Sequence, residues 1–324
     1  MLLEGWTAQA ITAAVQLGIA DALGDGPLPL PELARRVEAD PDAVRRLMRA
    51  LMGRGIFRLR GDGRYELNAL GDALRSDARF SAAGPARMFG SPEHREIWSH
   101  LADSIRSGSG MVAVLHGSNG FEYLNQDPER VEVFNKCMAD ITEMVSGSLV
   151  AAYPFGDYPT IVDVGGGTGQ TLAAVLRAAP ASRGVLHDLP AVVAGAAPRL
   201  WGRDVADRVK ISEGSFFETV PGGGDLYLLK QVLHDWPDAD AIRILENVRS
   251  SAPSGATILA VEYVVPEHNR DHPGHWSDLE MLVMQGGRER TAAEYRRLLE
   301  SAGLRMTRVV PTISPMSLVE ARAR

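Results

Sequence analysis

The chain has 324 residues, and its hydrophobic share of 45% and charged share of 23% are typical of a soluble globular protein with room for two domains. Its net charge of −7 argues against a general nucleic-acid or membrane-surface role, because phosphate contacts need a local excess of Lys and Arg. The sequence has neither an apolar stretch of membrane-spanning length nor a basic leader, and its single cysteine, Cys137, excludes an intrachain disulfide, so we expect a cytoplasmic protein.

The N-terminal part shows helical patterns that are followed by a hairpin pattern. The helices expected here span residues 7–23, 31–37 and 41–53. Residues 56–60 and 64–67 alternate in polarity on either side of Gly61-Asp62-Gly63, which predicts a β-hairpin. Helices followed by a hairpin in this order indicate a winged-helix unit, and we predict a mainly helical winged-helix domain over residues 1–90.

A second helical region is expected over residues 91–153. It contains one predicted helix near 93–106 and a long one over 128–153. The long helix places apolar residues on one face, namely Phe134, Cys137, Met138, Ile141 and Val145. Three partners for this face remain open: the protein core, a second subunit or the wall of a ligand pocket.

From Thr160 onward, short apolar runs alternate with helical patterns, which is typical of a parallel sheet covered by helices on both faces. The predicted strands are TIVDV (160–164), GVLHD (184–188), VKISEG (209–214), DLYLLK (225–230) and ATILAVEYVV (256–265). Two more runs, 305–313 and 317–322, are joined through Pro315 and predict an antiparallel hairpin at the sheet edge. We therefore expect a doubly wound α/β domain over residues 154–324.

The first strand of this domain runs directly into a glycine-rich turn and a helix. Gly165, Gly167 and Gly169 allow a ligand to approach the backbone closely at the carboxyl end of the strand. Dinucleotide enzymes use the same place, but their fingerprint requires Gly or Ala where this chain has Gln170, which disfavours a pyrophosphate. Asp188, at the end of the second strand, is placed to bind ribose hydroxyls, so the pattern indicates a nucleoside cofactor.

Three further residues occupy positions from which they can contact such a cofactor. Lys230 ends the fourth strand and is a candidate for the cofactor's amino-acid part, although a surface ion pair explains a lysine there nearly as well. Ser215 and Phe216 follow the third strand and can border the adenine.

The segment after the fourth strand contains the candidate general base, His234. A phenol with a pKa near 10 is a poor nucleophile when protonated, whereas a neutral imidazole with a pKa of about 6.5 can remove its proton. Such a base needs a carboxylate on its other ring nitrogen, and Glu262 and Glu289 are the candidates. A capping or core histidine is the alternative for His234, and a solvated surface carboxylate is the alternative for each glutamate.

A second cluster has the residue types of a metal site. His268, Asp271, His272 and His275 lie within one short segment. The Asn, Arg, Pro and Gly residues between them indicate an exposed loop with no helical register to bring the rings together, so we predict no metal.

Four segments together closely resemble a known family. They are VDVGGGTG (162–169), HDLP (187–190), LKQVLHDW (229–236) and GGRERT (286–291). The chain resembles the hydroxyindole and caffeate type of class I O-methyltransferases, whose bacterial members often act on secondary metabolites. In that family the winged helix is a dimerisation module, so the resemblance implies a homodimer that binds no nucleic acid.

The resemblance implies that S-adenosylmethionine is the cofactor and that its methyl group moves to a hydroxyl of a small aromatic molecule. It implies cofactor contacts at Gly165, Asp188, Ser215, Phe216 and Lys230, and His234 as base between Glu262 and Glu289. The acceptor pocket is implied to include Phe134, Met138, Asp278 and Met281, with Met144, Trp276 and Gln285 as further candidates. Ser215 departs from the family pattern at the adenine contact, where many relatives carry Asp. His187 stands where relatives usually carry an aromatic or aliphatic residue, and neither departure touches the residues implied for the chemistry.

Three other functions are weighed against methyl transfer. The helix-turn-helix and its arginines fit a DNA-binding regulator, but the acidic total and the complete catalytic pattern argue against one. A relative that binds the cofactor but hydroxylates or decarboxylates its substrate is a second alternative, and the presence of His234, Glu262 and Glu289 favours methyl transfer over it. A dehydrogenase is the least favoured.

Overall fold

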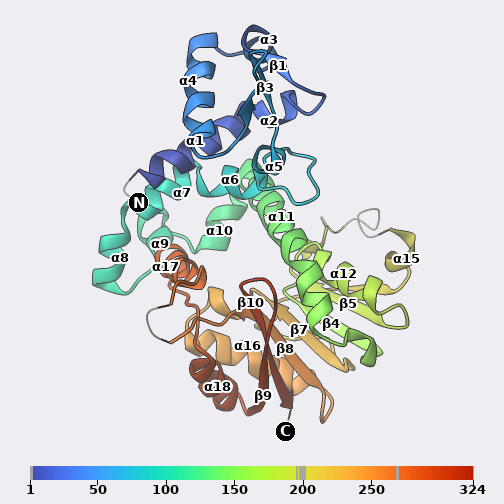
Figure 1. Cartoon of the computed structure of the whole chain (residues 1–324). Helices are drawn as coiled ribbons and strands as arrows, with labels where there is room; N and C mark the ends of the chain where they lie inside the picture. Colours follow the sequence, from blue (N-terminus) through green and yellow to red (C-terminus); the bar gives the residue numbers. More distant parts are fainter. Residues whose placement is uncertain (1–2, 195, 197–201, 268–269, 324) are drawn as a thin grey trace. The chain divides into compact units, whose positions relative to one another are not determined.

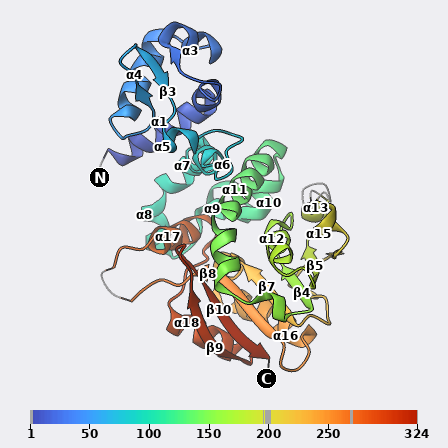
Figure 2. The same cartoon turned by 45° about the vertical axis from the view of Figure 1, so that its right-hand side comes forward.

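The computed structural model describes residues 3–194, 196, 202–267 and 270–323. By their internal contacts these residues form two compact units (Figures 1 and 2). Unit 1 comprises Met1–Ser99 and Phe121–Met144, and unit 2 comprises His100–Gly120 and Val145–Arg324. The domain boundaries expected from the sequence, after residues 90 and 153, stay predictions.

Unit 1 contains the winged-helix elements. Its helices are α1 (Glu4–Gln16), α2 (Ile19–Ala22), α3 (Leu30–Arg36), α4 (Pro41–Met52), α5 (Ala69–Asp72), α6 (Ala83–Phe89) and α7 (Pro92–Ser99). Its strands are β1 (Leu28–Pro29), β2 (Arg58–Leu59) and β3 (Arg64–Glu66), paired antiparallel in the order β1-β3-β2. The predicted hairpin is therefore confirmed, and β1 adds a strand that the sequence pattern did not indicate.

Two of the helices predicted as continuous are each broken into two. The helix expected over 7–23 ends at Gln16, because Gly18 adopts a left-handed conformation (φ 67°) that glycine alone accepts without strain. The helix expected near 93–106 is likewise divided at His100. Pro41, by contrast, starts α4 as expected, and the Asp40 side chain accepts a hydrogen bond from the Ala43 N–H (2.9 Å).

The remaining helices before the large sheet are divided between the two units. They are α8 (Leu101–Ser107), α9 (Met111–His116), α10 (Gly120–Asn125) and α11 (Pro128–Ala152), followed by the short 3₁₀ helix η1 (Phe155–Asp157). The long helix α11 was expected over 128–153. Among the described residues, no helix is both long and apolar enough to cross a membrane.

Unit 2 is built on a seven-stranded sheet in the order β6-β5-β4-β7-β8-β10-β9. The strands are β4 (Thr160–Val164), β5 (Arg183–Asp188), β6 (Val209–Glu213), β7 (Leu226–Lys230), β8 (Thr257–Tyr263), β9 (Leu304–Pro311) and β10 (Met316–Ala323). The first five are parallel, and β10 runs antiparallel to both β8 and β9. This confirms the mostly parallel sheet with an antiparallel C-terminal hairpin.

Helices cover both faces of this sheet. The described helices after β4 are α12 (Gln170–Ala178), α13 (Pro190–Val193), α15 (Arg203–Ala206), α16 (Asp238–Ser251), α17 (Gly274–Gln285) and α18 (Ala292–Ser301), with a 3₁₀ turn η2 (Leu233–Asp235). Apolar residues of α16 and α18 form one buried cluster with alternate residues of β4, β7 and β8. On the opposite face, Leu172 and Leu176 of α12 pack closely against Gly184 of β5. The sheet is thus covered by helices on both faces. A ligand can therefore reach it only at the loops that follow the strands.

Candidate active site

The predicted site residues of unit 2 gather at the carboxyl ends of the parallel strands. Gly165 follows β4, Asp188 ends β5, Lys230 ends β7 and Glu262 lies near the end of β8. Because β5, β4, β7 and β8 are neighbours in the sheet, these residues share one edge. In open α/β sheets this edge is where ligands bind.

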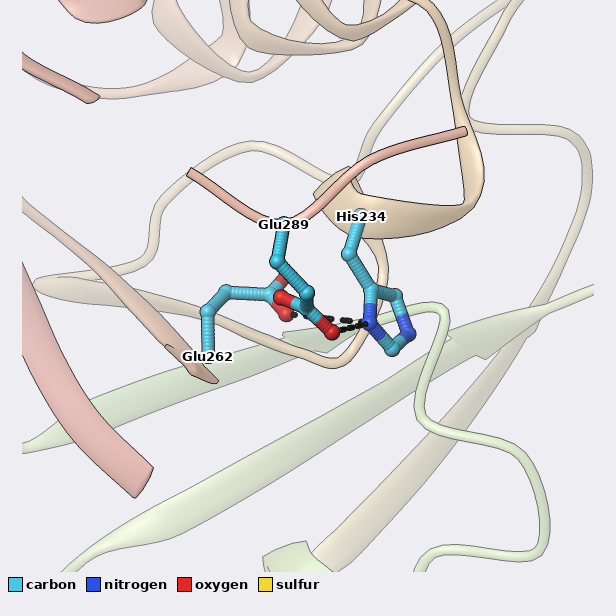
Figure 3. A group of neighbouring side chains, drawn as sticks. All are labelled: His234, Glu262 and Glu289. Atoms are coloured by element: carbon cyan, nitrogen blue, oxygen red, sulfur yellow. Dashed lines mark hydrogen bonds and ion pairs between the residues drawn. The ribbon is translucent and has the colours of Figure 1, made fainter. Parts of the chain in front are cut away.

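His234 lies in the turn η2 and is only 5% exposed. Its Nδ1 is 2.7 Å from Glu289 Oε1 and 3.8 Å from Glu262 Oε2 (Figure 3). Both glutamates predicted from the sequence as partners of His234 therefore lie beside its Nδ1 atom, and Glu289 is the one that forms a hydrogen bond with it. With Nδ1 occupied, Nε2 is the nitrogen that remains for proton transfer, and Asp235 Oδ1 is 3.6 Å from it.

Glu262 holds the turn that carries the histidine. Its Oε1 accepts hydrogen bonds from the backbone N–H groups of Val232 (3.1 Å) and Leu233 (2.9 Å). The Glu262 carboxylate, near the end of strand β8, is fully buried. The two N–H donors fix its orientation. Glu262 therefore has a structural task as well as an electrostatic one beside His234.

The GGRERT segment brings Glu289 to His234 through close backbone contact. Gly286 ends α17 in a left-handed conformation (φ 76°). A Cβ at Gly287 would overlap the His234 carbonyl oxygen and lie 2.6 Å from the Asp235 carbonyl carbon, so only glycine fits. The next residue, Arg288, donates its N–H to the His234 carbonyl (2.8 Å).

Arg290, in the same segment, clamps both sides of the histidine turn. Its guanidinium donates to the carbonyl oxygens of Leu233 (2.8 Å) and Trp236 (2.9 Å), and to Asp238 Oδ1 (2.8 Å). The side chain is only 1% exposed, so these bonds replace those it would make with water. The turn η2 is thus fixed before and after His234.

The charges around His234 determine its protonation. Burial lowers the pKa of His234, but the carboxylates of Glu262, Asp235 and Glu289 outweigh it and raise that pKa to about 10. Burial raises the pKa of Glu262 to about 7 and that of Asp235 to about 6, although the histidine opposes both shifts. These charges therefore favour the protonated imidazole at neutral pH.

The glycine-rich turn after β4 (residues 165–169, hereafter the cradle) has a largely left-handed backbone. Gly165, Gly167 and Gly169 all adopt positive φ (69°, 61° and 82°). A Cβ at Gly165 would lie 2.9 Å from Val232 Cγ2 and 3.3 Å from the Phe216 ring. Asp188 accepts the Gly167 N–H through Oδ2 (2.8 Å), which joins the end of β5 to the turn.

The predicted adenine contacts border this cradle. The Phe216 ring lies against Gly165 and meets Trp236 edge-on, with ring centroids 6.2 Å apart. The Ser215 hydroxyl accepts a hydrogen bond from the backbone N–H of Phe217 (3.2 Å), within the same loop. Phe216 is therefore placed to cover a flat group, whereas Ser215 is engaged locally.

Two buried charges lie beneath the cradle. Lys230 donates to the side chain of Gln231 (2.8 Å), and burial lowers its pKa to about 8 even though Asp163 and Glu262 favour the charged form. Asp163 on β4 is 1% exposed, and neither carboxylate oxygen has a hydrogen-bond partner among the described residues. Burial raises the pKa of Asp163 to about 7, and an unpartnered buried carboxylate at this position fits a cationic ligand group.

The predicted acceptor residues fall in different parts of the chain. Phe134 and Met138 lie on the part of α11 that belongs to unit 1, and both are half-buried. Asp278 and Met281 lie on α17 in unit 2, where Asp278 Oδ1 accepts the Glu289 N–H (2.9 Å). Their contact with an acceptor stays a prediction, and Asp278 has a second role in supporting Glu289.

Among the described residues, His234, Glu262 and Glu289 are the group whose ligand atoms approach one another closely enough for a metal, within 4.8 Å. His234 Nδ1 and the Oε1 atom of each glutamate already make the hydrogen bonds given above, so we interpret the group as a hydrogen-bonded cluster. The segment 268–275 was weighed as a metal site from the sequence, and its first residue, His268, lies outside the described residues. His275 Nε2 lies 3.1 Å from the Arg270 carbonyl oxygen, and the His272 ring packs edge-on against Tyr263.

Three residues of the site were missed in the sequence. They are Asp163, Arg290 and Ser277, whose hydroxyl donates to Glu289 Oε1 (2.6 Å). Asp163 had a signal, since it is the acidic residue within the apolar run TIVDV directly before the glycines. Arg290 lies inside the GGRERT motif, but the amino-acid sequence of that motif does not distinguish a buried arginine from an exposed one.

The sheet order and the buried histidine-carboxylate group at its carboxyl edge define a class I methyltransferase fold. Residues 98–305 match the model of the O-methyltransferase domain, and residues 2–77 match that of the O-methyltransferase dimerisation domain. The chain belongs to the O-methyltransferase family. This confirms the resemblance drawn from the four motifs.

Similar proteins span nearly the whole chain. A phenazine O-methyltransferase from Lysobacter antibioticus is 38% identical over 322 residues, covering 99% of this chain and 94% of the relative. The crystal structure of LaPhzM is similar with a TM-score of 0.93 at 38% identity, covering 98% of this chain and 96% of that one. NcsB1, an O-methyltransferase from neocarzinostatin biosynthesis, was solved with S-adenosylmethionine and 2-hydroxy-5-methyl naphthoic acid; its TM-score is 0.81 at 33% identity, with 98% and 96% covered.

Proposed function

We propose that the protein moves a methyl group from S-adenosylmethionine to a hydroxyl of a small aromatic molecule, with His234 as general base. The observation that carries this proposal is the buried imidazole whose Nδ1 is bound to Glu289, at the carboxyl edge of the sheet. The phenazine and naphthoic acid named for its relatives are flat aromatic compounds, which supports an acceptor of that class.

The residues around the cradle fit the proposed cofactor. We expect Asp188 to bind the ribose, because each of its oxygens keeps a free lone pair beside the one used by a backbone N–H. Phe216 would cover the adenine, and Gly165 and Gly167 leave room for the backbone to approach. The unpartnered carboxylate of Asp163 supports a nearby ammonium group, with Lys230 close to its carboxylate end.

When bound, S-adenosylmethionine supplies an electrophilic methyl group. His234 then has two tasks: to orient the acceptor hydroxyl and to accept its proton at Nε2 as the oxygen attacks. Glu289 on Nδ1 fixes the ring and stabilises the imidazolium that results. A cationic cofactor beside the ring would oppose the rise in the pKa of His234, since a like charge disfavours the imidazolium.

We also propose that the protein acts as a homodimer, because residues 2–77 match a dimerisation domain. Sedimentation equilibrium of the purified protein tests this, and a mass of one chain at micromolar concentration contradicts it.

The cofactor is tested by calorimetric titration with S-adenosylmethionine and, separately, with NADH. We expect micromolar binding of the first and none of the second. The reaction is tested by incubating the protein with methyl-deuterated S-adenosylmethionine and a panel of phenols, and by weighing the products by mass spectrometry. Conversion of an acceptor without gain of the labelled methyl would instead support hydroxylation or decarboxylation on this fold.

The base is tested with His234→Ala. We expect turnover to fall by about 100-fold or more while cofactor affinity stays within about twofold, because general-base catalysis contributes a factor of this order. His275→Ala is the matched control, since that histidine is exposed in unit 2 and its loss should leave turnover unchanged. Turnover of His234→Ala near that of the control would remove His234 from its role.

A further inference from the structure

The two carboxylates beside His234 are held in different ways. Glu262 accepts two backbone N–H groups through Oε1, so the polypeptide itself fixes its orientation. Among the described residues, no backbone N–H donates to the Glu289 carboxylate. Its Oε2 has no hydrogen-bond partner among the described residues, and its Oε1 lies within hydrogen-bond distance of His234 Nδ1 and of the Ser277 hydroxyl.

Ser277 reaches Glu289 from the first turn of α17. Its Oγ donates to Glu289 Oε1 at 2.6 Å, the same oxygen that lies 2.7 Å from His234 Nδ1. The neighbouring Asp278 accepts the backbone N–H of Glu289 at 2.9 Å. Two successive residues of α17 therefore fix both the main chain and the side chain of Glu289, whose carboxylate is fully buried.

We propose that Ser277 is a positioning residue for methyl transfer, which holds the Glu289 carboxylate on Nδ1 of His234. This inference rests on the proposed role of His234 as base. A glutamate side chain has three rotatable bonds, and burial alone does not choose among its rotamers. The Ser277 hydroxyl supplies the directional contact that backbone amides supply to Glu262.

Loss of the hydroxyl has a predictable electrostatic consequence. The imidazolium is stabilised by the Glu289 carboxylate, whose Oε1 lies 2.7 Å from His234 Nδ1. Without the Ser277 hydrogen bond that carboxylate is no longer held on Nδ1, so it stabilises the imidazolium less and the pKa of His234 falls. The other titratable groups that face Glu289 or His234 are Asp235 on η2, Glu262 and Tyr263 on β8, Asp278 on α17 and Tyr295 on α18. None of these groups is altered by a substitution at Ser277.

The test compares Ser277→Ala, Ser277→Thr and a control, Ser182→Ala. Ser182 is a buried serine of the same unit whose hydroxyl donates to the Tyr158 carbonyl (2.7 Å), so its loss measures the general effect of removing a buried serine hydrogen bond. For each variant we would measure kcat, the Kd for S-adenosylmethionine and the pKa of His234. The pKa comes from an NMR titration of the cofactor-free protein with labelled histidine, in which the His234 signal is identified by its absence from His234→Ala.

We expect Ser277→Ala to lower kcat by about 10-fold, since a hydrogen bond to a charged group contributes a factor of that order or more. Cofactor affinity should stay unchanged, the His234 pKa should fall, and Ser277→Thr should restore both kcat and pKa because it keeps the hydroxyl. A kcat and a His234 pKa like those of Ser182→Ala would overturn the proposal. The NMR titration needs no methyl acceptor, so this failure is distinct from a failure of the proposed base, which would appear as full turnover by His234→Ala.

Discussion

The imidazole of His234 and the carboxylate of Glu289 lie 2.7 Å apart, although 55 positions separate them in the sequence. The contact depends on two loops that pack backbone to backbone, the HDW turn after β7 and the GGRERT segment after α17. Because Glu289 occupies Nδ1, the tautomer and the direction of Nε2 are both determined before any substrate binds. The site is thus preorganised for removing a proton.

The first prediction concerns the pH dependence of kcat/KM for the acceptor. The pKa of His234 is raised by its carboxylates, so the imidazole is neutral only toward alkaline pH and kcat/KM should rise as pH increases from 7. Glu289→Gln removes one of these charges and lowers the pKa, so its acid limb should lie at lower pH than that of the wild type. Glu300→Gln, an exposed site on α18, should leave the profile in place. If the acid limb of the Glu289→Gln profile lies at the same pH as that of the wild type, or at a higher pH, the Glu289 carboxylate does not control the pKa of His234.

The second prediction concerns Gly287. Its φ is not positive, so alanine carries no backbone strain there, but its Cβ would overlap the His234 carbonyl oxygen. We expect Gly287→Ala to separate the two loops and to lower turnover by at least about 10-fold, because misplacement of a catalytic group by 1 Å can cost more than that. Gly156→Ala, where a Cβ meets nothing within 4 Å, is the control and should retain full turnover. Equal turnover of the two variants would contradict the packing described.

The third prediction concerns the Arg290 clamp. Arg290→Lys keeps the charge but loses the planar fork, which leaves the carbonyls of Leu233 and Trp236 without their donor. We expect a loss of about 3 kcal/mol in the free energy of unfolding, since each buried carbonyl left unsatisfied costs about 1–3 kcal/mol. Denaturant unfolding measures it, with Arg297→Lys as the exposed control. A midpoint that differs from the control by less than the experimental error would show that the clamp contributes little.

The fourth prediction concerns the buried carboxylate of Asp163. Burial raises its pKa to about 7 from the ordinary 3.8, so the folded protein binds this proton more tightly than the unfolded chain. Its contribution to stability therefore declines as pH rises from about 4 to about 7 and is constant above.

Asp163→Asn removes this ionisation while keeping the shape of the side chain. We expect the cofactor-free variant to gain stability over the wild type as pH rises through that window, by about 4 kcal/mol at most. Its affinity for S-adenosylmethionine should fall at the same time. Thermal unfolding at pH 4.5 and 7.5 with and without cofactor measures both effects. A variant that is less stable than the wild type at pH 7.5, or that binds the cofactor equally well, would contradict the role given to Asp163.

Periodicity was sufficient to predict the large sheet. The predicted strands 160–164 and 225–230 agree with β4 and β7 within one residue. Apolar runs with Pro and Gly at their ends are a strong signal because burial on both faces leaves little room for polar residues. The short helices α6, α9 and α10 were missed, since a helix of six or seven residues gives too few turns to show a period.

The site was predicted less completely than the fold. His234, Glu262 and Glu289 were found because each follows or ends a strand or belongs to a motif. Ser277 was missed because its role depends on where one turn of α17 comes to lie beside a segment twelve residues away. Arg290 was missed because a buried guanidinium that bonds to carbonyl oxygens has no sequence pattern. Contacts of this kind depend on how distant segments pack together, and that packing cannot be read from the amino-acid sequence.

The order of the strands also bears on how the molecule is made. Strand β8, which carries Glu262, pairs on one side with β7 and on the other with β10, although β9 precedes β10 in the chain. On the ribosome β8 therefore keeps one unpaired edge until residues Met316–Ala323 have emerged and inserted between β8 and β9. During that interval the edge is open to chaperones and to other nascent chains, and Glu262 is not yet enclosed. The site is thus completed only when β10 inserts between β8 and β9.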